Sequence, residues 1–154
     1  MFQIALFEPC IAPNTGNIIR LAANMGCKLH LIEPLGFSMD EKRLRRAGLD
    51  YHEFAEVKIH RDYWAFKSTL TGHRIIACTT KGEVLYTQLN FNEKDVLLFG
   101  AETHGLDQDV FDDVAAEHRV RIPMKAGSRS INLANAVAIV SYEAARQLTF
   151  EGLV

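Results

Sequence analysis

The stretch that decides the fold is residues 98–106, which read LFGAETHGL. It closes the apolar run Val96–Phe99, which has the length expected of a buried parallel strand. Gly100 follows this run and carries no Cβ, so a ligand can approach the backbone there. Glu102 lies in the turn, and Gly105 precedes the next helix-like run. The pattern predicts a strand, a turn and a helix, with a candidate binding loop between them.

Two nucleotide-binding motifs are excluded for this loop. No Lys-Ser or Lys-Thr pair follows Gly105, as a Walker A loop requires, and the spacing does not match G-x-G-x-x-G. The plain alternative is a tight β–α turn that uses glycine for a positive φ angle, with Glu102 pointing at solvent. From this loop alone, both interpretations stay open.

Two further stretches have the same design: residues 13–20, PNTGNIIR, and residues 122–136, IPMKAGSRSINLANA. Each places small or polar residues in a turn between a strand-like and a helix-like run. Helix N-termini leave backbone N–H groups unpaired, and α/β proteins bind ligands beyond the carboxyl ends of their strands. We therefore expect the three stretches to meet in one pocket.

The whole chain alternates between strand-like and helix-like runs. Strands are expected at Ile4–Phe7, Leu29–Ile32, Val57–Ile59, Ile75–Thr79, Val96–Phe99 and Arg119–Ile122. Helices are expected at Asn14–Met25, Asp40–Arg46, Asp62–Leu70, Asp107–Val114 and Asn132–Leu148, with Gly26 ending the first and Asp62 and Asp107 as N-caps. This alternation predicts an α/β fold, a parallel sheet with helices on both faces. Because no repeat or linker interrupts it, residues 1–154 are expected to form a single domain.

Composition excludes several classes of protein. The 154 residues are 48% hydrophobic and 23% charged, as is usual for one globular domain. No apolar run approaches the roughly 20 residues of a membrane helix, and the N-terminus lacks a signal peptide's basic region. Cys10, Cys27 and Cys78 form no CxxC pair, so neither a metal site nor a disulfide framework is predicted. Reduced thiols and the absence of membrane or export signals predict a cytoplasmic protein.

Charge leaves nucleic-acid binding open. The formal net charge is −2 and the pI about 6.3, whereas dedicated nucleic-acid binders are often basic overall. Basic residues are nevertheless clustered, at Lys42, Arg43, Arg45 and Arg46 and, around the third stretch, at Arg119, Arg121, Lys125 and Arg129. Each cluster is either a set of phosphate contacts or a solvated surface.

Together and in this order, the three stretches resemble the signature of the SPOUT superfamily of RNA 2′-O-methyltransferases. Within it, the chain is similar to the small, single-domain enzymes that methylate the wobble ribose of tRNA, from Phe2 to about Gln147. The resemblance implies a C-terminal trefoil knot, which periodicity does not predict and which other folds nearly always lack. It also implies S-adenosylmethionine as cofactor without a metal, tRNA as substrate, and a two-fold homodimer.

The first stretch carries the leading catalytic candidate. Asn17, Arg20 and Asn24 share one helix face, which by itself is as consistent with a solvated stripe. Asn14 and Arg20 match the Asn and Arg of the family's first motif. The resemblance thus implies a catalytic set of Arg20, Asn14, Glu102, Ser130 and Asn132. Because a guanidinium is a poor general base, we expect Arg20 to stabilise the developing 2′-alkoxide, with Glu102 holding Arg20 or the loop.

The third stretch is denser in polar residues than an N-cap at Ser130 or Asn132 requires. An adenosyl ligand needs backbone and hydroxyl partners together with apolar walls, which Ile122, Met124 and Leu133 can supply. The resemblance implies cofactor contacts from Cys78, Gly100, Ile122 and Ser130, and Met124 completes this set as a wall. Cys78 is expected to act through its backbone rather than its thiol.

Three other functions remain as alternatives. A hydrolase would use Ser128 or Ser130 with His104 and Glu102, but the G-x-S-x-G elbow of common α/β hydrolases is absent. An RNA-binding assembly factor could use the same fold without catalysis. A methyltransferase could instead act on rRNA or on another position of tRNA. Binding of S-adenosylmethionine separates the methyltransferases from the hydrolase and the simple RNA-binding module.

Overall fold

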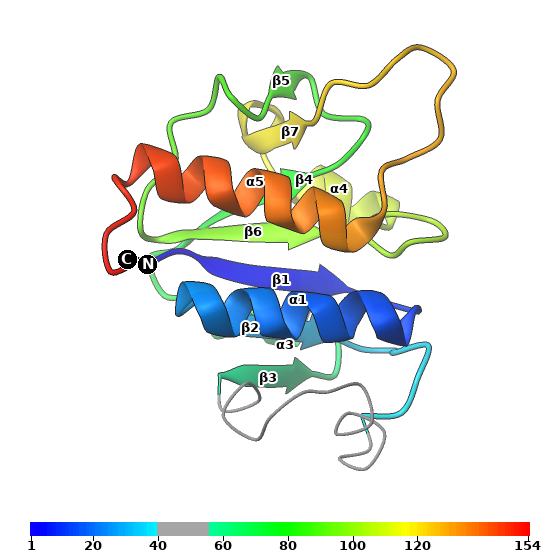
Figure 1. The fold of residues 1–154 in the computed structure, drawn as a ribbon. Helices are drawn as coiled ribbons and strands as arrows, with labels where there is room; N and C mark the ends of the chain where they lie inside the picture. The colour runs from blue at the N-terminus through cyan, green and yellow to red at the C-terminus, as the bar shows by residue number, and fades with distance from the viewer. Residues whose placement is uncertain (40–55) are drawn as a thin grey trace.

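The computed structural model of the protein describes residues 1–39 and 56–154. Its strands are β1 (Gln3–Phe7), β2 (Leu29–Ile32), β3 (Val57–His60), β4 (Arg74–Cys78), β5 (Val84–Leu85), β6 (Asp95–Phe99) and β7 (Arg119–Arg121). Its helices are α1 (Ala12–Met25), α3 (Tyr63–Ser68), α4 (Gln108–Asp113) and α5 (Leu133–Gln147), with a 3₁₀ helix at Ala116–His118. The strands form one parallel sheet in the order β3-β2-β1-β6-β4-β7-β5 (Figure 1). The predicted α/β fold is confirmed.

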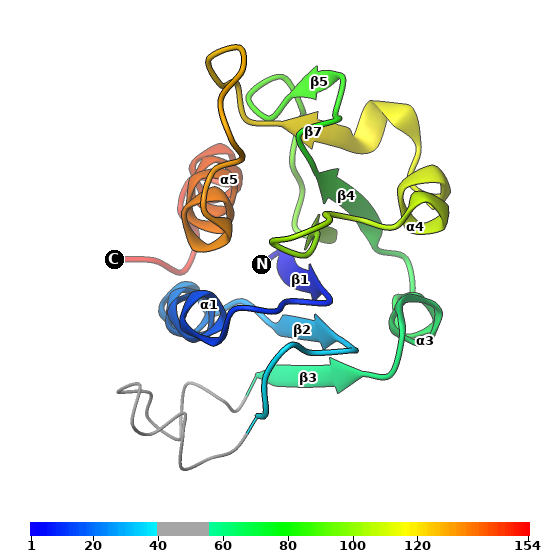
Figure 2. The same ribbon diagram turned by 90° about the vertical axis from the view of Figure 1, so that its right-hand side faces the viewer.

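Helices cover both faces of this sheet. Figure 2 shows α1 and α5 side by side on one face and α3 and α4 on the other. Successive residues of β1 supply the two core layers: Ile4 and Leu6 pack on the α1 and α5 side, Ala5 and Phe7 on the α3 and α4 side. Because both faces are buried, the central strands are continuous apolar runs rather than alternating ones.

The strand register aligns the carboxyl ends of the three central strands. Leu6 of β1 pairs with Phe99 of β6, and Phe99 also pairs with Cys78 of β4. The segments that follow these strands therefore leave the sheet side by side. This alignment brings together residues that are far apart in the sequence.

Helix α1 begins at Ala12, two residues before the predicted start at Asn14. Pro13 lies in its first turn, where the missing N–H costs no hydrogen bond. The predicted helix is confirmed, but Asn14 is buried within it, so the small and polar residues of the first stretch lie in α1 and not in a turn before it. Gly26 ends α1 with a φ of 66°, in the left-handed region, as predicted.

Of the two predicted caps, Asp62 and Asp107, one is confirmed, and of the two candidates for the last helix, Ser130 and Asn132, the cap is Asn132. Asn132 Oδ1 accepts from the N–H groups of Ala134 at 2.9 Å and Asn135 at 3.3 Å, at the start of α5. Asp62 Oδ1 accepts from the Ala65 N–H at 2.7 Å, at the start of α3. Asp107 precedes α4, but its side chain makes no capping bond.

Two short elements were not predicted, β5 and the 3₁₀ helix. Segments of two or three residues are too short to show a period. Strand β5 exists because Val84 pairs with Val120 of β7, a contact between distant residues. The predicted helix Asp40–Arg46 lies outside the described residues.

The trefoil knot stays a prediction. Strand order and register do not show whether the chain passes through an earlier loop near the segment 122–132.

Within residues 1–39 and 56–154, no helix has both the length and the apolar character needed to cross a membrane.

Candidate active site

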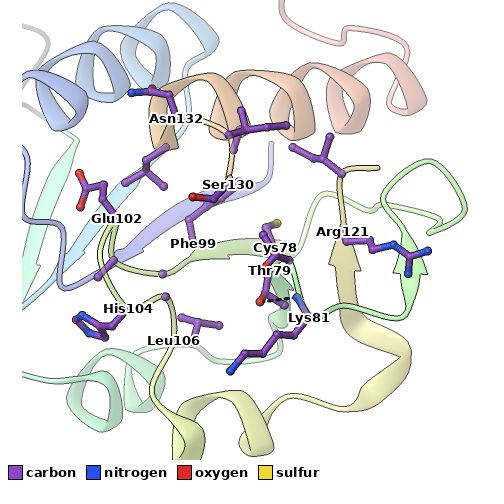
Figure 3. A pocket seen from close by; sticks show the side chains of 18 of the residues that line it. Cys78, Thr79, Lys81, Phe99, Glu102, His104, Leu106, Arg121, Ser130 and Asn132 are labelled. Carbon is purple, nitrogen blue, oxygen red and sulfur yellow. Dashed lines mark hydrogen bonds between the residues drawn. The ribbon is translucent and has the colours of Figure 1, made fainter. Parts of the chain in front are cut away.

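A cavity of about 420 Å³ opens at the carboxyl ends of β4, β6 and β7 (Figure 3). The loop after β6, the segment 122–132 and the start of α5 surround it. The predicted site residues that line it are Asn14, Cys78, Gly100, Glu102, Ile122, Met124, Ser130 and Asn132. The three sequence stretches therefore meet in one pocket.

The loop after β6 folds back on itself. The Ala101 N–H donates to the Gly105 carbonyl at 3.0 Å, and the Gly105 N–H donates to the Ala101 carbonyl at 2.9 Å. A Cβ on Gly100 would lie 2.3 Å from the carbonyl carbon of Gly105, which no side chain tolerates. The space beside Gly100 is thus filled by the loop's own backbone, not left for a ligand as the sequence argument assumed. Gly105 itself has a φ of +73°, which favours glycine.

Four donors hold the Glu102 carboxylate. Its Oε2 accepts from the Cys10 N–H at 2.8 Å and from the Cys10 thiol at 3.1 Å. Its Oε1 accepts from the Ile11 N–H at 3.2 Å and from Asn14 Nδ2 at 3.1 Å. Burial alone would raise the pKa of Glu102, but the hydrogen bonds from Cys10 and Asn14 outweigh it and hold that pKa below its usual value. Glu102 is therefore ionised and holds the loop before α1 through hydrogen bonds, and it does not point at solvent.

The hydrogen-bond network around Glu102 continues through two asparagines. Asn14 is only 7% exposed; its Nδ2 donates to Glu102, and its Oδ1 accepts from Asn132 Nδ2 at 2.9 Å. Asn132 uses its own Oδ1 to cap α5. Glu102, Asn14 and Asn132 therefore tie the loop after β6, helix α1 and helix α5 into one unit.

The predicted cofactor residues line the pocket together with apolar side chains. Leu106, Ile122 and Leu133 supply apolar surface. Burial raises the pKa of the Cys78 thiol, and its Sγ lies 3.8 Å from the Ile76 carbonyl oxygen. A thiol of this kind is unreactive, which agrees with a backbone role for Cys78.

Thr79, Thr80 and Lys81 also line the pocket and were missed by the sequence analysis. They follow β4 directly, as Figure 3 shows for Thr79 and Lys81. Because the ends of parallel strands gather at one edge, their position after a predicted strand is the signal that could have found them.

Arg20 lies apart from the other predicted catalytic residues. It is exposed on α1 and does not line the cavity. It follows Asn14 by six residues, about 9 Å along the helix axis. Asn17 and Asn24 are exposed with it, so the predicted polar face is present. The fold thus gathers Asn14, Glu102, Ser130 and Asn132 and leaves Arg20 on the outer face of α1.

His104 also lines the cavity, where its Nε2 lies 3.3 Å from Glu8 Oε2 and 3.6 Å from Asp107 Oδ1. Neither Ser128 nor Ser130 is among its hydrogen-bond partners, so the described residues assemble no Ser–His pair for a hydrolase.

Across the described part of the chain, no three His, Cys, Asp or Glu side chains are grouped so as to hold a metal ion.

The SpoU rRNA Methylase family matches residues 1–142, which include every residue of this pocket. The chain belongs to the SpoU rRNA methylase family. The family predicted from the three sequence stretches is thereby confirmed. Among SpoU relatives, a Yersinia pestis protein named tRNA (cytidine(34)-2'-O)-methyltransferase is 55% identical, over 99% of this chain and 97% of its own.

Solved structures of SpoU relatives agree with the fold. One, described as giving structural insights into the 2-OH methylation of C/U34 on tRNA, has a TM-score of 0.89 at 42% identity and covers 97% of both chains. An AdoMet-bound rRNA methyltransferase from Sinorhizobium meliloti has a TM-score of 0.82 at 26% identity, covering 96% of this chain and 56% of that one. This chain therefore has the architecture of SpoU methyltransferases along nearly its whole length.

Proposed function

We propose that this protein is an S-adenosylmethionine-dependent tRNA methyltransferase that modifies the 2′-hydroxyl of wobble nucleotide 34, a cytidine or a modified uridine. The observation that carries this function is the 55% identity, over 99% of the chain, with a tRNA (cytidine(34)-2'-O)-methyltransferase. The match spans the pocket and every element around it. We therefore infer the same reaction and the same acceptor position.

The pocket fits an adenosyl group. Its volume of about 420 Å³ lies within the usual range of small-molecule sites, roughly 300–1,000 Å³. Leu106, Ile122 and Leu133 offer apolar surface to the adenine ring, and Ser130 offers a hydroxyl group. The backbone that follows β4 and β6 offers further hydrogen-bond partners. Cys78, Gly100, Ile122, Met124 and Ser130 would hold the cofactor.

When bound, S-adenosylmethionine would supply a sulfonium methyl group, to which the ribose 2′-oxygen would bond in line as the methyl–sulfur bond breaks and S-adenosylhomocysteine leaves. The protein's own part is to orient the ribose and stabilise its developing charge. Asn14 and Asn132 line the pocket in fixed orientations, which suits them to hold the ribose. Glu102 keeps them in place. Arg20 would stabilise the 2′-oxyanion electrostatically.

We also propose a two-fold homodimer that buries α5 and α1, the helix that carries Arg20. Helices α1 and α5 lie side by side (Figure 2). Both carry exposed side chains. Ile139 is 37% and Tyr142 48% exposed on α5, and Ile11, 45% exposed, precedes α1. Apolar side chains gathered on one face stabilise an interface. Sedimentation should show a dimer at micromolar concentration; an active monomer would contradict this assembly.

Phosphate contacts would hold the tRNA. Lys125 and Arg129 are exposed in the segment that borders the pocket; the basic cluster of Lys42, Arg43, Arg45 and Arg46 lies outside the described residues. Neutralising Arg43 and Arg46 together should weaken tRNA binding and flatten its salt dependence, without changing the affinity for S-adenosylmethionine. An unchanged salt slope would assign the cluster to a solvated surface.

Because tRNA is the substrate, we place the protein in the cytoplasm.

Two measurements test the function. Calorimetry should detect S-adenosylmethionine binding to the purified protein. Methyl mapping of RNA from a deletion strain should show the loss of 2′-O-methylation at position 34 of particular tRNAs. The mapping must include rRNA, because the family description and the Sinorhizobium meliloti relative name that substrate. A methyl group lost from rRNA alone would replace the tRNA assignment, and cofactor binding without any lost methyl group would favour an assembly factor.

Variants of Arg20 test its assigned role. Arg20→Ala and Arg20→Lys should nearly abolish methylation while the affinity for S-adenosylmethionine stays within a few fold, because lysine lacks the planar fork. Turnover and cofactor affinity are measured on the same preparations. Most of the turnover surviving in Arg20→Ala would remove Arg20 from the mechanism.

A further inference from the structure

Cys10 stands outside the residues assigned to the reaction, yet it donates twice to Glu102. Its N–H lies 2.8 Å and its thiol sulfur 3.1 Å from Glu102 Oε2. The other oxygen, Oε1, is held by the N–H of Ile11 and the amide of Asn14. Among the described contacts, both donors to Oε2 therefore belong to Cys10, and its side chain is the donor that a substitution can remove.

Gly36, in the loop after β2, holds Cys10 in place. A Cβ on Gly36 would lie 2.6 Å from Cα and Cβ of Cys10 and 2.8 Å from its carbonyl oxygen. The Gly36 N–H also donates to the Pro9 carbonyl at 3.0 Å. Most of these neighbours are backbone atoms, so rotating a side chain could not relieve the clash. Only glycine lets this loop lie directly against Cys10.

We propose that Cys10 is a positioning residue for methyl transfer, held in place by Gly36 and acting through Glu102 and Asn14. This role rests on the proposed function. Without the thiol, the Glu102 carboxylate loses one of its four donors, and only the Cys10 N–H still holds Oε2. The carboxylate can then shift within its remaining hydrogen bonds, and Asn14, whose amide donates to Oε1, shifts with it in the pocket. A displacement of about 1 Å can lower the rate of a positioned reaction by about a hundredfold.

The thiol is suited to remain a donor. Burial raises the pKa of Cys10, and the neighbouring Glu102 raises it further. Cys10 therefore keeps its proton near neutral pH and donates it to the carboxylate. A hydroxyl group would also donate, whereas a methyl group would not.

Three cysteine variants test the role. Cys10→Ala should lower kcat about tenfold while the KM for tRNA and the Kd for S-adenosylmethionine stay within about twofold. Cys10→Ser should recover most of kcat, because it restores a donor. Cys27→Ala is the matched control: Cys27 is buried in the core, with its sulfur 4.0 Å from the Met25 carbonyl oxygen, and its loss should leave kcat unchanged. Unchanged kcat in Cys10→Ala, or equal kcat in Cys10→Ala and Cys10→Ser, would overturn the proposal.

A readout independent of turnover separates this role from the proposed function. The side-chain amide signal of Asn14 in a ¹⁵N-labelled sample should shift in Cys10→Ala and in Gly36→Ala, return in Cys10→Ser, and not move in Cys27→Ala. If the wild type neither binds S-adenosylmethionine nor methylates tRNA, the proposed function fails, and this signal still decides whether Cys10 positions Asn14. An Asn14 signal that is the same in all variants would overturn the positioning role even in an active enzyme.

Discussion

Acid should destabilise this protein through His30, a buried histidine of β2. Its side chain is in the core, with the residue only 3% exposed. Its Nδ1 lies 2.9 Å from His60 Nε2, and its Nε2 lies 2.6 Å from Gln3 Oε1. Burial lowers the pKa of His30 to about 4, with help from four nearby groups: His60, Lys58, Lys28 and His73.

The sign and size follow from the difference between the native and unfolded pKa. In the unfolded chain a histidine has its ordinary pKa of about 6.5. Between about pH 6.5 and 4 the unfolded chain therefore binds a proton that native His30 does not, so stability falls as the pH falls. At about 1.36 kcal/mol per pKa unit, the loss is about 2 kcal/mol by pH 5 and about 3 kcal/mol by pH 4. Burial also lowers the pKa of His60, which adds loss in the same direction.

Urea unfolding between about pH 7.5 and 5, at one protein concentration, measures this loss. The control is His30→Gln, which keeps a polar side chain beside Gln3 but cannot titrate. We expect its unfolding free energy to be less sensitive to pH than that of the wild type. NMR of the imidazole Cε1 proton should show native His30 neutral down to about pH 5. A His30 that titrates near its ordinary pKa, or equal pH slopes in the two proteins, would refute the reasoning.

Three further substitutions test packing and the pocket. Asp95 is 0% exposed and receives two hydrogen bonds of 2.8 Å from Arg74. Asp95→Ala should lower the unfolding free energy measured in urea by about 3 kcal/mol, because the Arg74 guanidinium loses its carboxylate partner. A change below about 1 kcal/mol would contradict this. Ser141 is 0% exposed, and its hydroxyl has no hydrogen-bond partner among the described residues. Ser141→Ala should therefore raise the unfolding free energy by about 0.5–1 kcal/mol, seen as a higher Tm; a lower Tm would imply a bonded hydroxyl. Gly100→Ala should abolish calorimetric binding of S-adenosylmethionine, because the new Cβ meets Gly105 at 2.3 Å; binding at wild-type affinity would show that the loop after β6 is dispensable.

The strands and caps were predictable because their causes are local. Runs such as Val96–Phe99 are apolar at every position, which indicates a strand buried on both faces. Asn132 and Asp62 cap helices through N–H groups two or three residues away. Asp107 had the same local pattern, yet its carboxylate lies near His104 instead of bonding to the backbone of α4. The local pattern alone therefore does not decide whether a side chain caps its helix.

The sequence by itself determined the three stretches that meet in the pocket, because glycines and polar residues after apolar runs can be recognised without a partner. It did not find Thr79, Thr80 and Lys81, and it placed Arg20 in the site although Arg20 does not line the cavity. Only the tertiary structure decided which atoms meet. Glu102 is 92 positions from Cys10, and their contact depends on β1 and β6 being neighbours in register. It also depends on the approach of Gly36 to Cys10. A hydrogen bond requires a distance and an angle set by the whole fold, whereas a sequence pattern carries only residue type and spacing.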